Sequence, residues 1–245
     1  MRKTTVATLT AVGLVSFLAT NAHAQAVAGA LQVGIGTGLV SYTSPTYTVH
    51  NYPVGPGAIV GDLKTNPPIT TWGFASRNGV TLEGGYGLND MFVIGGMLQL
   101  GGWSQSSLPA PGNATDKTSM FDLFIAPKLD VMFLPESRVR PFVGGAIGLT
   151  HFGTTTERTT PAAGGATVTT TPNSAAGTGI GLLGRAGIRW FLTPGFSIDP
   201  AFVFSYSAMS GSTDELRNAV TYSYDSSMSS YTIGLNVGFS GWVGL

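Results

Sequence analysis

The sequence predicts an all-β fold, an eight-stranded antiparallel transmembrane up-and-down β-barrel that follows a cleaved signal peptide. Three observations predict it. Eight stretches alternate between apolar and polar side chains with a period of two. Charged residues make up only 10% of the chain, against about 25% in ordinary soluble domains. Short turns alternate with long polar connections along the chain, as they do in barrels that span a bilayer.

The predicted strands are separated by turn residues rich in Gly, Pro, Asn and Asp. They cover residues 27–42, 72–86, 92–103, 121–133, 139–152, 180–191, 196–209 and 229–243. Tight turns are predicted at residues 88–90, 134–137 and 193–195, and long loops at residues 44–70, 104–118, 153–179 and 210–227. All the long loops fall at one end of the strands, which favours a membrane barrel over a soluble sandwich.

The clearest alternation lies in residues 121–133, because successive strand side chains point to opposite faces. One row there is wholly apolar, from Phe121 through Leu129 to Phe133, and is predicted to face lipid. The other row carries three charges and is predicted to face a polar lumen. In the first strand the predicted outward row consists of Val27, Leu31, Val33, Ile35 and Leu39. Glycines occupy much of its inward row, which suits a narrow barrel.

The N-terminus has the pattern of a secretory signal peptide. Arg2 and Lys3 precede a mostly apolar stretch, and Ala22-His23-Ala24 fits the small-x-small rule for cleavage. We therefore expect a signal peptide over residues 1–24 and one transmembrane barrel domain over residues 25–245. The chain has no cysteine, so an exported form cannot rely on disulfides.

The charge of the chain excludes one class of partner. Twelve basic residues balance twelve acidic ones, and removal of the predicted signal peptide takes away two of the basic residues. The mature protein then has a slight acidic excess and no basic patch. We therefore expect no nucleic-acid binding.

Two segments resemble the small OmpA/OmpX-type outer-membrane barrels. Residues 140–149, RPFVGGAIGL, are similar to a middle strand of that family, and residues 231–239 are similar to its C-terminal insertion signal. The resemblance implies a location in the outer membrane of a Gram-negative bacterium and assembly by the barrel-insertion machinery. The chain departs from the family in the six residues after Phe239, which either continue the strand in phase or follow an internal signal. It also leaves no room for a peptidoglycan-binding domain, so a bare barrel is expected.

Seven charged side chains are predicted to face the lumen. They are Glu83, Asp122, Lys128, Asp130, Arg185, Arg189 and Asp199. Arg189 and Asp199 lie equally far from Pro194 in the turn between their strands, so we expect them to be neighbours. A narrow lumen must pair its charges, because unpaired buried charge is costly. The network is therefore either a structural plug or a gate in which paired side chains exchange partners.

Catalytic and cofactor sites have little support. An enzyme would need His50 or His151 paired with a serine or a carboxylate near the loop end of the barrel. His50 lies in a Pro/Gly loop, where a solvated side chain is expected, and His151 is predicted to point at lipid. No His pair stands at ligand spacing and the chain has no cysteine, so no metal is predicted, nor any cofactor.

The sequence thus predicts an outer-membrane barrel with a structural or surface-interaction role and a plugged or very narrow charged lumen. The alternatives are a small-solute channel gated by the lumen salt bridges and a lipid-modifying enzyme. We expect a monomer surrounded by outer-membrane lipid. A surface ligand would bind through the loops at residues 44–70 and 153–179.

Overall fold

The computed structural model describes residues 27–53, 60–65, 69–72, 79–106, 115–161, 167–217 and 220–244. Its regular elements are β-strands. They are β1 (Leu31–Pro53), β2 (Val60–Thr65), β3 (Ile69–Trp72), β4 (Val80–Gly87), β5 (Phe92–Ser106), β6 (Thr115–Met132), β7 (Val139–Pro161), β8 (Thr167–Thr193), β9 (Phe196–Arg217) and β10 (Val220–Val243). Within these residues, no helix has the length and apolar character needed to cross a membrane. The predicted signal peptide, residues 1–24, lies outside the described residues.

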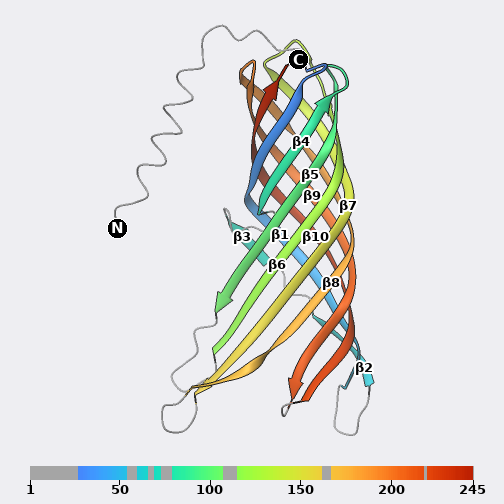
Figure 1. Ribbon diagram of the computed structural model, residues 1–245, viewed down its shortest axis with the longest axis vertical. Helices are drawn as coiled ribbons and strands as arrows, with labels where there is room; N and C mark the ends of the chain where they lie inside the picture. Colours follow the sequence, from blue (N-terminus) through green and yellow to red (C-terminus); the bar gives the residue numbers. More distant parts are fainter. Residues whose placement is uncertain are drawn as a thin grey trace, which may run out of the picture.

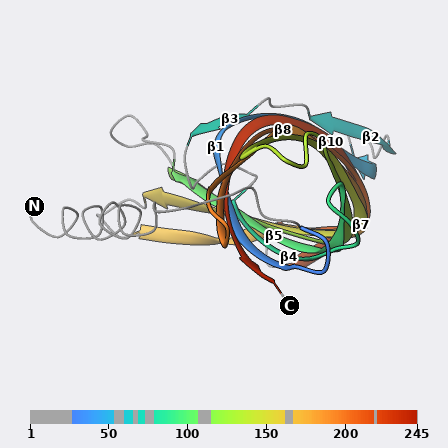
Figure 2. The same cartoon turned by 90° about the horizontal axis from the view of Figure 1, so that it is seen from above.

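Eight of the strands close into a barrel (Figures 1 and 2). The antiparallel order runs β1, β4, β5, β6, β7, β8, β9, β10, and β10 pairs again with β1. This confirms the predicted eight-stranded up-and-down barrel. The strand β4 pairs only with the first part of β1, and β3 and β2 then pair with the rest of the same edge. Closure removes the open sheet edges that lipid cannot satisfy.

The two faces of the barrel wall are those predicted from the alternation. In β6, Phe121, Ile125 and Leu129 are exposed on the outside, whereas Lys128 and Asp130 are buried inside. The same alternation holds along the other strands of the ring. Such a continuous belt of exposed large apolar side chains is rare on soluble monomers, and it is the surface that a transmembrane barrel presents to lipid.

The three predicted tight turns join β4 to β5, β6 to β7 and β8 to β9. They lie at the same end as Leu31 and Val243, which pair with each other. We call this the turn end, which is uppermost in Figure 1, and the opposite end the loop end. The strand β10 continues in phase past Phe239, because Trp242 is buried and Val243 is exposed.

Val27 corrects one face assignment. It was predicted to face outward, but it lies before β1 and is 1% exposed, in an apolar cluster at the turn end. Its backbone N–H donates to Asp90 Oδ1 at 2.8 Å, and that of Ala28 donates to the same oxygen at 3.2 Å. The alternation cannot be extended to Val27 because the chain there has left the sheet and turns into the mouth of the barrel.

Most of the long predicted loops are also corrected, because they are largely strand. Within residues 44–70, β1 continues to Pro53, β2 covers Val60–Thr65 and β3 begins at Ile69. β7 and β8 cover most of residues 153–179, and β9 and β10 cover most of residues 210–227. Threonine favours extended backbone, and each strand finds a ladder partner on a strand that already stands in the ring. The wall therefore extends far past the loop end of its apolar belt.

Candidate functional site

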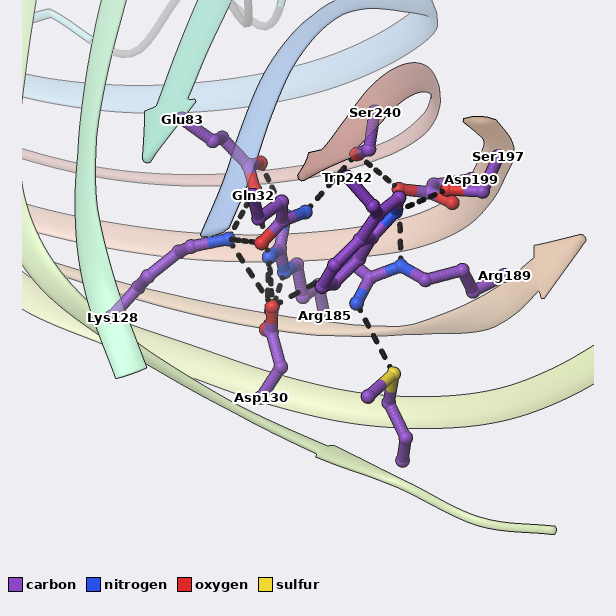
Figure 3. A network of polar contacts seen from close by, with 11 residues as sticks. Gln32, Glu83, Lys128, Asp130, Arg185, Arg189, Ser197, Asp199, Ser240 and Trp242 are labelled. Atoms are coloured by element: carbon purple, nitrogen blue, oxygen red, sulfur yellow. Dashed lines mark hydrogen bonds and ion pairs between the residues drawn. The ribbon is translucent and has the colours of Figure 1, made fainter. Parts of the chain in front are cut away.

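The lumen near the turn end contains six of the seven predicted inward charges (Figure 3). Glu83 comes from β4, Lys128 and Asp130 from β6, Arg185 and Arg189 from β8, and Asp199 from β9. They point inward because each stands on the row opposite to the lipid-facing side chains. Together with Gln32 of β1 and Ser240 of β10 they form one set of polar contacts, which we call the lumen network.

Arg185 lies at the centre of the lumen network. Its Nε donates to Asp130 Oδ1 at 3.0 Å and its Nη2 to Asp130 Oδ2 at 2.6 Å. The same guanidinium binds Glu83 through both Nη atoms, with Nη2 at 3.0 Å from Oε2. Because β4 and β8 stand at opposite positions of the ring, the ion pair between Arg185 and Glu83 spans the lumen.

Lys128 adds a second cation to the same carboxylates. Its Nζ lies 2.6 Å from Glu83 Oε2 and 3.3 Å from Asp130 Oδ2. The third contact of Nζ is with Gln32 Oε1, at 3.0 Å. All three ammonium contacts are therefore to oxygen, which satisfies the hydrogen-bonding capacity of a lysine.

A second arm of the lumen network runs along β8, β9 and β10. Arg189 Nε donates to Asp199 Oδ2 at 3.2 Å, so the neighbours expected from the turn at Pro194 are in contact. Ser240 Oγ donates to the same oxygen at 2.7 Å and accepts from Gln32 Nε2 at 3.0 Å. An ion pair of 3.7 Å between Arg189 and Asp130 closes a continuous ring of contacts.

The lumen network is electrically balanced and largely buried. It contains three carboxylates and three cations, and the side chains of Asp130, Arg189 and Lys128 are at most 1% exposed. Removing charges from water is costly, and only close pairing with well-placed hydrogen bonds offsets that cost. Gly144 makes the close approach possible, because a Cβ at this position would overlap Asp130 Oδ1.

Aromatic side chains lie beside the lumen network toward the turn end. The guanidinium of Arg189 lies 4.9 Å from the Trp242 ring centroid and 5.1 Å from that of Phe142. Arg140 lies 4.9 Å from the Phe191 centroid, and its Nε donates to the Ser137 carbonyl at 3.1 Å. Cations over aromatic faces are attracted to the ring quadrupole, and most strongly when desolvated. The rings of Phe142, Phe191 and Trp242, which we call the aromatic floor, thus bind and cover the cations.

Asp122, the seventh predicted residue, lies apart from the lumen network. It is eight positions from Asp130 on the same strand, or about 26 Å of extended chain. It borders a cavity of about 40 Å³ with Gln99, Thr150 and Ser230. A second cavity of about 40 Å³ borders Glu83 and Arg185. Each has room for only one or two water molecules.

Four residues of this region were missed by the sequence analysis. Gln32 and Ser240 are uncharged, and Arg140 and Trp242 stand close to predicted strand ends. The signal was present in the alternation, because Arg140 shares its row with Phe142, and Ser240 its row with Trp242. Among the described residues, no three His, Asp or Glu side chains converge so as to hold a metal ion.

Comparison with known proteins identifies the fold. No family model matches the sequence, and no curated protein matches it. The outer membrane protein OprG from Pseudomonas aeruginosa is 10% identical, with 89% of this chain and 97% of that chain covered and a TM-score of 0.50.

Two further solved structures are similar. They are the outer membrane protease OmpT from Escherichia coli (11% identity, 87% and 97% covered, TM-score 0.43) and Ail, the attachment invasion locus protein of Yersinia pestis (13%, 86% and 99%, 0.32). At these identities the likeness concerns the fold alone. The chain has the fold of the small outer-membrane β-barrels.

Proposed function

We propose that this outer-membrane barrel is sealed and acts at the cell surface, as a structural or interaction protein. The observation that carries the proposal is the ion pair between Glu83 and Arg185, which joins opposite walls of the lumen. The rest of the lumen network fills the surrounding cross-section, and the adjoining cavity holds only about 40 Å³. A hydrated ion needs a wider path than the contacts of these side chains leave.

The strands that rise beyond the lipid support a role at the surface. Exposed aromatic pairs mark the two edges of the apolar belt, Phe196 with Phe239 at the turn end and Tyr42 with Tyr231 toward the loop end. A transmembrane strand needs about 9–11 residues, whereas β8 has 27 and β10 has 24. The excess forms a tall rim outside the membrane. A ligand would bind there, through residues 44–70 and 153–179.

The barrel must first reach the outer membrane. The chain is exported by the signal peptide at residues 1–24 and inserted by the barrel-assembly machinery of a Gram-negative bacterium. Its domain of residues 25–245 acts as a monomer, because β10 pairs with β1 and so closes the ring within the apolar belt. Lipid surrounds the apolar belt.

A gated channel for small solutes is the second candidate. The observation that favours it is that the side chains of Arg185 and Glu83 are 11% and 13% exposed, more than those of the other ion-paired members of the lumen network. They also border the cavity beside the network. If Arg185 left Glu83 and kept Asp130 as its partner, the bridge across the lumen would open without leaving Arg185 unpaired.

Single-channel recording separates the two candidates. The refolded mature barrel is placed in a planar bilayer beside the variants Arg185→Ala and Arg189→Ala, with Asp122→Asn as a control outside the lumen network. A silent wild type, with conductance appearing only in the arginine variants, supports the sealed barrel. Discrete openings of the wild type that change in Arg185→Ala but not in Asp122→Asn would overturn it in favour of the gate.

A second experiment addresses the surface role. The last residues of β7, 157–161, and the first residues of β8, 167–170, are replaced together with the residues between them by a short turn. Because these ends of β7 and β8 lie beyond the membrane part of the wall, the shortened chain is expected to refold and remain silent. Cells that display it should lose the attachment to a polystyrene surface or to other cells that the full chain confers. Unchanged attachment would move the interaction to another part of the rim.

A further inference from the structure

Three polar side chains from three strands meet on the rim beyond the membrane. His50 stands on β1, between β2 on one edge and β10 on the other. Its Nδ1 lies 3.2 Å from Asp62 Oδ1 of β2, and its Nε2 lies 3.0 Å from Ser227 Oγ of β10. His50 was expected to have a solvated side chain, whereas it contacts both a serine and a carboxylate, and pairing with either one was the requirement for an enzyme.

The two contacts use different nitrogens of the ring, and this sets the roles of the three residues. A carboxylate beside Nδ1 accepts a hydrogen bond from Nδ1–H, which leaves Nε2 as the acceptor. The hydroxyl of Ser227 then donates to Nε2. A serine whose hydroxyl donates to a histidine that is itself oriented by a carboxylate is an activated nucleophile, on whatever fold it occurs.

A β-bulge explains how the sheet brings these side chains together. The pairing of β1 with β2 shifts register between Val49 and Tyr52, and Asn51 has a φ of 55°. The ladder with β10 ends at Val49. Bulges re-aim side chains, and they occur often beside active sites. His50 and Asn51 are the residues that this bulge adds to β1 opposite β2.

The position of His50, Asp62 and Ser227 on the wall limits which substrates could reach them. Val49 and Ser226 are buried on the inner face, so His50 and Ser227 are on the outer face of the wall. On β1 the group lies eight positions past Tyr42, or about 27 Å of strand beyond the apolar belt. The side chains of His50 and Asp62 are 40% and 48% exposed. A substrate must therefore be polar and accessible from the water layer outside the membrane.

We propose that Ser227, His50 and Asp62 form a serine-hydrolase site that cleaves carboxylic esters of polar molecules at the outer surface. Ser227 Oγ attacks the ester carbonyl carbon and its proton passes to His50 Nε2. The C–O bond to the alcohol breaks, the alcohol leaves with that proton, and an acyl group remains on Ser227. Water then attacks the acyl carbon, His50 takes and returns a proton, and the carboxylic acid leaves.

Each residue has a distinct role in this reaction. Ser227 and His50 are catalytic residues, because both touch the reacting atoms. Asp62 is a positioning residue, which acts through the ring of His50. This hydrolase activity goes beyond the surface role of the barrel, and it departs from the sequence-based expectation that catalytic sites have little support. It does not depend on whether the lumen is sealed, since the lumen network and this site lie at opposite ends of the strands.

The test uses the full mature barrel refolded in detergent micelles, with a fluorophosphonate probe that labels activated serines and p-nitrophenyl acetate as the ester. Wild type is expected to be labelled at one serine and to cleave the ester at least tenfold faster than Ser227→Ala. The matched control is Ser229→Ala, two positions along the same face of β10 and likewise half-buried. It should behave as wild type.

Variants of the other two residues separate catalysis from a merely structural contact. His50→Gln should abolish labelling, Asp62→Asn should slow it at least tenfold, and Asp62→Glu should restore part of the rate. The shift of unboiled protein on gel electrophoresis checks that every variant is folded. Wild type that is labelled no faster than Ser227→Ala would overturn the proposal, as would loss of labelling in Ser229→Ala alone.

Discussion

Replacing Asp130 by asparagine tests the energetics of the lumen network most directly. Asp130 is 0% exposed and pairs with three cations, Arg185 at 2.6 Å, Lys128 at 3.3 Å and Arg189 at 3.7 Å. Asparagine keeps the shape of the side chain and removes only its charge. The balance of three carboxylates and three cations then becomes two against three, and one buried positive charge is left without compensation.

The expected cost follows from the burial of these groups. Breaking a buried ion pair by removing one partner costs about 3–5 kcal/mol, because the remaining charge stays out of water. Hydrogen bonds to charged groups each contribute about 1.5–3 kcal/mol, and Asp130 accepts from both Arg185 and Lys128. Asparagine retains weaker versions of some of these bonds. We therefore expect Asp130→Asn to lower the free energy of unfolding by about 4 kcal/mol.

The assay is reversible urea unfolding of the refolded barrel in lipid vesicles, followed by tryptophan fluorescence. Asp122→Asn is the matched control, since it makes the same change on the inner face of the same strand outside the lumen network, and a much smaller effect is expected. Combining Asp130→Asn with Lys128→Met restores the charge balance. The double variant should recover about 2 kcal/mol relative to Asp130→Asn alone, as coupled neighbours do.

Two results would refute this reasoning. A loss below about 1 kcal/mol in Asp130→Asn would mean that water reaches the lumen network and screens its charges as it does at a surface. Equal losses in Asp130→Asn and Asp122→Asn would mean that burial along the strand, not the network, determines the cost.

Three further predictions use the same unfolding assay. Leu129→Arg places a charge on the lipid face and should cost about 2–4 kcal/mol, whereas an equally damaging Ala126→Arg with a harmless Leu129→Arg would show that the faces are reversed. Gly144→Ala should destabilise the barrel strongly because the new methyl group overlaps Asp130. Gly184→Ala, on the lipid-facing row of β8 with no atom closer than 4.0 Å to the added Cβ, is the control and should be close to neutral. Trp242→Phe keeps an aromatic ring but removes the indole N–H that donates to Ser197 Oγ at 3.1 Å. It should lower the free energy of unfolding by about 1 kcal/mol. An unchanged free energy of unfolding would mean that water replaces this hydrogen bond.

The sequence predicts the barrel wall well because the face of each residue depends only on its position along its own strand. The alternation in β6 assigns Leu129 and Lys128 to opposite faces by geometry alone, since each residue reverses the direction of the side chain. The contact of Arg189 with Asp199 is also predictable, because the turn at Pro194 sets the register of two adjacent strands.

The contacts across the lumen are not predictable in this way. Glu83 and Arg185 are separated by about a hundred residues and by half the ring, so their contact depends on how the closed barrel is staggered. The same limit applies to His50, Asp62 and Ser227, which a bulge and two ladders bring together. Neither arrangement has a signature in the spacing of residues along the chain.

The rim beyond the membrane was misassigned for a different reason. Its segments are rich in Ser, Thr, Gly and Pro, as in residues 153–179, and that composition usually indicates a loop. Here strands already paired in the membrane continue their ladders outward, so each added residue gains a backbone partner without a new nucleation step. A strand that is already paired in the membrane lengthens along its neighbouring strand. This tertiary effect outweighs the turn propensity of the residues.

The seam between β1 and β10 has a consequence for how the chain folds. It joins residues at the two extremes of the sequence, as in the hydrogen bond from Gln32 to Ser240 across 208 positions. Contacts of such high sequence separation form slowly, because chain entropy is lost before they are made. Until they form, two strand edges lie unpaired, which lipid does not tolerate. A partly assembled ring is therefore not stable in the bilayer. Deleting either terminal strand should abolish the whole fold, because the seven remaining strands cannot close.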